Sequence, residues 1–224
     1  MAQRLKNSGN GVPRLLREIA YERLKESIRN GVLQPGEPLS ETSVSEELNI
    51  SRTPVREAIQ QLAQEGLVQV LPNRAVTVAA LTFEEVMNVL HVRILLEPEI
   101  ARLSAESMSD KQLKKLLKAM EEMESAAERD ERTQWSRWDH VWHETLAEAC
   151  PNSLLGKLGL GMRDRIQHLA VDAQTPGSRL LACTEEHRAV VEAILKKDGG
   201  AARDGMRHHL EQLRKSFFHR LIHS

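Results

Sequence analysis

Cysteine is scarce in this sequence, and long apolar runs are absent. Two cysteines, Cys150 and Cys183, occur among 224 residues. They are too few for a disulfide framework, so we expect both to be reduced members of a helical core. No apolar run reaches the roughly 18 residues that a membrane span requires. The N-terminus also lacks the apolar segment of a signal peptide. These absences predict a cytoplasmic protein with no membrane span.

Neither sign of charge dominates. The chain carries 31 Lys and Arg residues against 32 Asp and Glu residues, a net charge of −1. Residues 1–80 hold a slight excess of basic side chains, and residues 81–224 a slight excess of acidic ones. Residues 1–12 read as a short basic arm, because Arg4 and Lys6 precede the first acidic residue. The difference between the halves is too small to indicate nucleic-acid binding, so such evidence must come from motifs.

Residues 13–80 predict three helices followed by a β-hairpin. Pro13 suits a helix start, and Ser40 and Ser51 suit the N-caps of the next two helices. Residues 72–74 read as the turn of the hairpin. The helices are expected over 13–30, 40–48 and 51–64, and the strands over 67–71 and 76–80. This order is that of a winged helix-turn-helix.

Residues 82–224 change character and carry almost no strand signals. Apolar residues recur there at helical spacing, with breaks at Pro, Gly, Asp and Asn. Six helices are expected, at about 83–107, 110–129, 133–149, 152–172, 177–198 and 200–222. The predicted fold is therefore mainly α, with the winged helix-turn-helix of residues 13–80 followed by an antiparallel helical bundle.

The helix that begins after Ser51 carries residues that could read DNA. A helix-turn-helix inserts the N-terminal side chains of its second helix into the major groove. Arg52 and Arg56 are four residues apart and share one face, and arginine matches both guanine edges and phosphates. Ser51 and Thr53 can donate hydrogen bonds to phosphate. Periodicity alone fits a solvated helix face equally well.

The motifs of this half resemble the GntR family. Residues 31–41 read Gly-Val-Leu-Gln-Pro-Gly-Glu-Pro-Leu-Ser-Glu, and 50–58 read Ile-Ser-Arg-Thr-Pro-Val-Arg-Glu-Ala. The resemblance implies operator contacts by Arg52, Thr53 and Arg56, and a wing whose tip reaches the minor groove.

The predicted wing departs from the family pattern at one position. The family often has Asn-Arg-Gly at the wing tip, whereas here Ala75 follows Arg74. Alanine does not readily adopt a positive φ. We therefore expect Arg74 to contact DNA from a wing that turns differently.

Polar residues lie on the apolar face of the helix predicted over 133–149. Asp139 falls inside a stripe that includes Trp135 and Trp142, and His143 falls at its edge. The two are four residues apart, so their side chains converge. His140 is expected to point further out.

Two later helices each place one histidine inward. His187 lies on an apolar face of the helix predicted over 177–198, and His209 lies within the stripe of the last helix, with His208 facing away. A lone histidine on an apolar face is usually a core residue with a satisfied hydrogen bond. One carboxylate and three imidazoles together would instead suit Zn²⁺, Ni²⁺ or Mn²⁺.

The helical half resembles the FadR-like subgroup, whose C-terminal domain is of the FCD type. That resemblance implies a metal site built from an Asp-x3-His pair and two later histidines. The matching positions are Asp139, His143, His187 and His209. The resemblance also assigns Arg93 to the acid group of an effector, while a surface arginine remains the alternative for that residue.

These features predict a DNA-binding transcription regulator and not an enzyme. Its operator affinity would be controlled by a small carboxylic acid bound beside a metal ion, with Zn²⁺ the first choice. We expect a homodimer, because two heads one DNA turn apart read a near-palindromic operator. A metal-ion sensor is the alternative. A metal hydrolase lacks support, because no further inward acid stands out as a general base.

Overall fold

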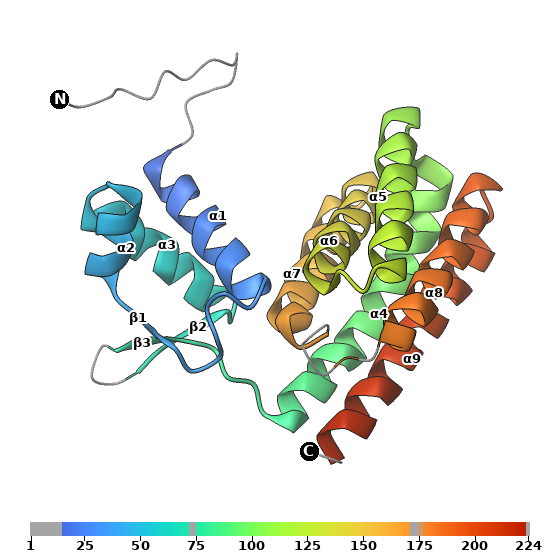
Figure 1. Ribbon diagram of the computed structural model, residues 1–224. Helices are drawn as coiled ribbons and strands as arrows, with labels where there is room; N and C mark the ends of the chain where they lie inside the picture. Colours follow the sequence, from blue (N-terminus) through green and yellow to red (C-terminus); the bar gives the residue numbers. More distant parts are fainter. Residues whose placement is uncertain (1–14, 72–74, 171–174, 176, 223–224) are drawn as a thin grey trace.

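The chain folds into two lobes that lie side by side (Figure 1). The computed structural model describes residues 15–71, 75–170, 175 and 177–222. The predicted basic arm, residues 1–12, lies outside the described residues. The first lobe, the head, contains α1 (Leu16–Arg29), β1 (Pro38–Leu39), α2 (Glu41–Leu48), α3 (Arg52–Gln64), β2 (Val68–Val70) and β3 (Val76–Val78). The second lobe, the body, contains α4 (Phe83–Ser107), α5 (Asp110–Glu128), α6 (Arg132–Ala149), α7 (Ser153–Ala170), α8 (Gly177–Leu195) and α9 (Gly199–Ile222).

The head is a winged helix-turn-helix, as predicted. Ser40 caps α2 by accepting a hydrogen bond from the amide of Ser43 at 3.2 Å. Asn49 ends α2 with a φ of 53°, a left-handed conformation that asparagine tolerates. The turn leads into α3, whose apolar face is buried against α1 and the sheet. Its buried residues are Val55, Ala58, Ile59 and Leu62.

The sheet of the head has one strand more than predicted. The strand order is β1-β3-β2, with both pairings antiparallel. Strands β2 and β3 form the expected hairpin, with Val68 opposite Val78. The additional strand β1 has two residues and pairs Pro38 with Thr77. Strand β1 thereby pairs the loop after α1 with the wing.

The body is an all-helical bundle with its own apolar core. Thr82 and Glu85 form a capping box at the start of α4, and Ser109 and Gln112 form another at the start of α5. Helix α4 packs most extensively on α9, and α5 packs on α6. The six predicted body helices are present, with α8 ending at Leu195 rather than near residue 198. None of the described helices combines the length and apolar character needed to cross a bilayer.

Helix α1 of the head faces α7 of the body (Figure 1). Lys25 forms a 2.9 Å ion pair with the buried Asp164. An Arg29 guanidinium nitrogen lies 2.8 Å from Nε2 of His140. The prediction that His140 points outward is wrong, because this histidine is buried between α1 and α7. A regular helix places it on the outer side of α6, but the head and Arg163 of α7 cover that side.

Candidate metal centre and DNA-contact surface

The predicted DNA-contact residues gather at the start of α3. Ser51, Arg52, Thr53 and Arg56 are all exposed. The N-terminus of α3 adds unpaired amide groups, which favour phosphate. Four basic or hydroxyl side chains and the start of a helix thus share one exposed surface.

Glu41 of α2 holds the two arginines of this surface. Its carboxylate accepts two hydrogen bonds from Arg56, at 2.8 and 2.9 Å, and one from Arg52 at 3.2 Å. The Arg56 hydrogen bond lowers the pKa of Glu41, so the carboxylate is ionised at neutral pH. Glu41 therefore fixes the orientation of both guanidinium groups before DNA arrives.

The wing is described except at its tip. Arg74, predicted to contact the operator, lies outside the described residues. On either side of the tip, the amide of Leu71 donates to the carbonyl of Ala75 at 2.8 Å, which closes the hairpin. Ala75 is described, and it is not among the residues with a positive φ. Ala75 thus has a backbone conformation that alanine tolerates.

The predicted metal ligands come together inside the body. Nε2 of His187 lies 3.2 Å from Oδ1 of Asp139 and 3.3 Å from Nε2 of His143. The His143 nitrogen lies 3.6 Å from the same carboxylate oxygen. His209 places a ring nitrogen within 4.8 Å of the other two imidazoles. Helices α6, α8 and α9 supply these four side chains, and all four are buried.

The spacing of these atoms suits a divalent cation. Two nitrogens at about 2.0 Å from zinc and at the tetrahedral angle lie about 3.3 Å apart. The ligand-to-ligand distances of 3.2, 3.3 and 3.6 Å match that value closely. An ion could therefore sit between Asp139, His143 and His187 with little movement of these three side chains.

The histidine rings are oriented by hydrogen bonds at their other nitrogen. Nδ1 of His143 lies 3.2 Å from the Glu97 carboxylate. Nδ1 of His187 donates to the carbonyl oxygen of Cys183 at 2.7 Å, and Nδ1 of His209 lies 2.8 Å from Glu186. Metal-binding histidines commonly have such acceptors, which fix the tautomer and leave Nε2 free for the metal.

Three arginines surround the centre, each paired with a carboxylate. Arg163 donates to Asp139, with its other terminal nitrogen 3.1 Å from Nδ1 of His140. The remaining pairs are Arg93 with Glu97 and Arg179 with Glu186. Arg93 is 2% exposed, so it is not a surface arginine.

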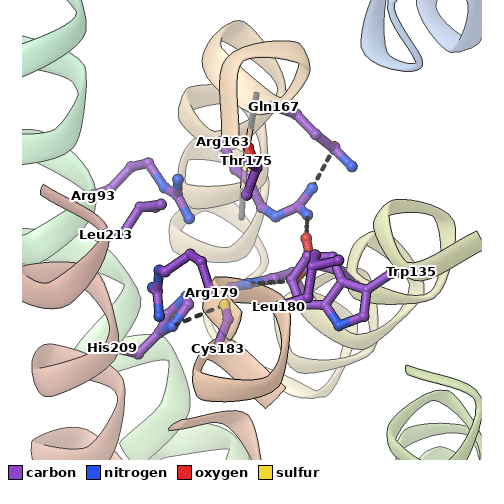
Figure 2. A pocket seen from close by; sticks show the side chains of 12 residues that line it. Arg93, Trp135, Arg163, Gln167, Thr175, Arg179, Leu180, Cys183, His209 and Leu213 are labelled. Atoms are coloured by element: carbon purple, nitrogen blue, oxygen red, sulfur yellow. Dashed lines mark hydrogen bonds and ion pairs between the residues drawn. The ribbon is translucent and has the colours of Figure 1, made fainter. Parts of the chain in front are cut away.

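These arginines line a small cavity next to the histidines (Figure 2). Its volume is about 30 Å³, more than the roughly 10–15 Å³ that one water molecule needs. Gln167, Thr175 and Cys183 also line it. The cavity thus combines three cationic groups with the edge of the histidine cluster.

The charges of the centre favour a cation between Asp139 and His187. Although burial opposes ionisation, Arg163 holds the pKa of Asp139 well below its usual range. Burial and Arg163 lower the pKa of His143 to about 3, so this imidazole is neutral and has a free lone pair. Burial also opposes a charge on His187, but Cys183 and Asp139 raise the pKa of His187 to about 10. A proton is thus favoured at the position that a metal ion would take.

The sequence alone does not identify several residues of the centre. Arg163 and Gln167 lie four residues apart on α7, a spacing that by itself predicts only that they share a helix face. Glu186 precedes His187 in the sequence, but its carboxylate lies 2.8 Å from Nδ1 of His209. Helical spacing is the one signal that the sequence offers here. Cys183 lies four residues before His187, just as Asp139 lies four residues before His143.

Two family profiles match the chain. The profile described as "Bacterial regulatory proteins, gntR family" matches residues 16–78, and the FCD domain matches residues 88–212. The chain belongs to the GntR family and carries an FCD domain. The first profile covers the head from α1 to β3, and the second covers the candidate metal centre. Both family resemblances inferred from the sequence are thereby confirmed.

Curated relatives of this GntR-family regulator are transcription regulators. The HTH-type transcriptional repressor RspR of Escherichia coli K12 is 30% identical over 199 residues, covering 88% of this chain and 86% of RspR. The gluconate operon transcriptional repressor of Bacillus subtilis is 28% identical, covering 80% of this chain and 75% of the relative.

Solved structures share the fold. Escherichia coli McbR/YncC has a TM-score of 0.83 at 21% identity, covering 93% of this chain and 99% of that structure. A GntR structure from Rhodococcus sp. RHA1 has a TM-score of 0.74 at 22% identity, covering 90% and 97%. These similarities extend across both lobes.

Proposed function

We propose that this GntR-family regulator holds a divalent cation, with zinc the first choice, at Asp139, His143, His187 and His209. A small carboxylic acid bound beside the cation would control its affinity for operator DNA. The observation that carries the proposal is the orientation of the three imidazoles. Each has its Nδ1 next to a hydrogen-bond acceptor, which directs Nε2 toward a shared position.

Charge balance supports an anionic effector. The three arginines and their three carboxylates cancel one another in charge. A divalent cation would leave the centre with surplus positive charge, which is costly in a buried site. A carboxylate bound to the cation and to Arg93 or Arg179 would neutralise that surplus. The bound metal would supply a Lewis-acidic position for the acid, and the arginines would orient it.

The size of the cavity favours a second candidate, in which the metal ion itself is the signal. A volume of about 30 Å³ accommodates an ion or a water molecule. A carboxylic acid with several carbon atoms needs more room. Under the leading proposal, Gln167 and an arginine side chain must therefore move aside when the acid binds.

Contacts between the lobes suggest how the centre communicates with DNA. Arg163 bonds Asp139 and lies beside His140, whose other ring nitrogen contacts Arg29 of the head. An acid that attracts Arg163 would disturb this chain of contacts and change how the head is held. Operator affinity would follow by linkage between the two sites.

We also propose that the protein acts as a homodimer on a near-palindromic operator. One head presents one recognition helix, and two heads read two half-sites. Large exposed apolar side chains on the adjacent helices α4 and α7 offer a surface for a second copy. Leu95 of α4 is 63% exposed and Leu154 of α7 is 66% exposed. Binding to operator DNA would place the protein in the bacterial cytoplasm.

A binding titration tests the proposal. An operator would first be selected from random duplex DNA with the purified full-length protein. Its dissociation constant would then be measured with metal-free protein, with added Zn²⁺, and with added Zn²⁺ plus a series of small carboxylic acids. The leading proposal predicts a response to one acid at constant metal content. A response to Zn²⁺ alone would establish the metal-sensor alternative, and no response to any of them would overturn both.

A further inference from the structure

A single carboxylate lies between the two arginines at the start of α3. Glu41 is the first residue of α2, and its Oε2 accepts hydrogen bonds from Arg52 at 3.2 Å and from Arg56 at 2.8 Å. Its Oε1 accepts from Nε of Arg56 at 2.9 Å. The side chain of Glu41 is 21% exposed, whereas those of Arg52 and Arg56 are 59% and 57% exposed. The carboxylate is therefore the most sheltered of the three groups, and it holds both guanidinium groups from the side of the protein.

The contacts with Glu41 leave donors of both arginines for another partner. A guanidinium group has five N–H bonds, and Glu41 accepts two from Arg56 and one from Arg52. The Nε–Nη2 edge of Arg56 is thus occupied, whereas its outer end, formed by Nη1 and Nη2, can still donate. That end has the geometry for two parallel hydrogen bonds to O6 and N7 of a guanine. Glu41 therefore orients Arg56 without blocking the end that could read a base.

Stability gives little reason for this arrangement. Exposed ion pairs add little to stability, because water weakens their attraction and both side chains lose freedom. An acid in the first turn of α2 also favours the helix dipole, but that role requires no arginine. The first helix of a helix-turn-helix crosses the DNA backbone, so a carboxylate at the start of α2 would repel phosphates. An arginine without this restraint could instead reach a phosphate of any sequence.

We propose that Glu41 is a positioning residue that sets the sequence specificity of this regulator. It holds Arg56, and through one hydrogen bond Arg52, in the orientation that reads guanine, and it keeps both from the phosphates of random DNA. The inference rests on the operator binding of the proposed function. Loss of the carboxylate strengthens binding to random DNA and reduces discrimination between sequences.

Glu41→Gln tests this inference in the full-length protein, because glutamine keeps the size of the side chain and removes its charge. Dissociation constants would be measured for the selected operator and for a random duplex of equal length, over a series of salt concentrations. The variant should bind the random duplex more tightly. The ratio of the two constants should fall about fivefold or more, the lower limit of what one bidentate base contact contributes. The log–log salt dependence on the random duplex should steepen by about 0.9 for each arginine that gains a phosphate.

Glu47→Gln is the matched control. Glu47 lies on the same helix and pairs with Arg23 at 3.6 Å, so this variant removes the same charge and leaves Arg52 and Arg56 held. Its ratio of the two constants should equal that of the wild type. An equal fall in both variants would overturn the inference, since overall charge would then explain the effect. Weaker binding of both duplexes by Glu41→Gln at an unchanged ratio would also overturn it, because Glu41 would then only support the fold of the head.

A double substitution connects the effect to Arg56. In a protein that carries Arg56→Ala, the further change Glu41→Gln should alter the ratio less than it does in the wild type. An equal change in both backgrounds would show that Glu41 does not act through Arg56 and would overturn the inference. These outcomes leave the operator binding standing, whereas a wild-type protein that selects no sequence from random duplex DNA would overturn the proposed function itself.

Discussion

Replacing His187 with alanine should weaken metal binding severely. His187 has no exposed surface, and its Nε2 faces both Asp139 and His143. Structural zinc sites with four ligands bind with about 10–16 kcal/mol, so one ligand contributes about 2.5–4 kcal/mol on average. At about 1.4 kcal/mol per factor of ten, the loss is about 10²- to 10³-fold in affinity.

The measurement is a competition between the protein and a chromogenic chelator for Zn²⁺. His208→Ala is the matched control, because His208 is exposed beside His209, and it should leave the affinity unchanged. Circular dichroism would verify that both variants keep their helices. An affinity for Zn²⁺ in His187→Ala equal to that of the wild type would refute the assignment of His187 as a ligand.

Three other substitutions probe the remainder of the molecule. Arg52→Ala should cost about 1–3 kcal/mol in operator binding and less on random duplex DNA; equal losses on both would mean that Arg52 contacts only phosphate. Leu62→Ala removes a fully buried side chain of the head and should lower the free energy of unfolding of the head by about 2–5 kcal/mol. Hydrogen exchange of the α3 amides, followed as urea is raised, measures this loss, and an unchanged urea midpoint would contradict it. Arg29→Ala removes the contact with His140 and should accelerate amide hydrogen exchange in α1 but not in α5; equal rates in both proteins would argue against this link between the lobes.

The elements that local signals define were well predicted. Ser40 and Thr82 are capping residues with clear sequence signatures, and the helices that they start begin where expected. Strand β1 was missed because two residues carry no periodicity. Its existence depends on pairing with β3, which is distant in the sequence.

The candidate site shows the same division between local and tertiary information. Asp139 and His143 could be placed on one face because spacing within a helix determines that face. Arg163 could not be found in this way, since only the packing of α7 against α6 brings it to Asp139. His140 was placed on the outer side of α6, and only the docked head shows that this side is buried.

The central claim is that one metal ion lies among Asp139, His143, His187 and His209. Anomalous diffraction from crystals of the purified full-length protein, collected above and below the absorption edge of zinc, tests it most directly. One anomalous peak should lie within coordination distance of Nε2 of His143 and His187, and it should disappear below the edge. Zinc-replete crystals with no peak at that position, or with a peak elsewhere in the body, would show that these residues do not hold the ion.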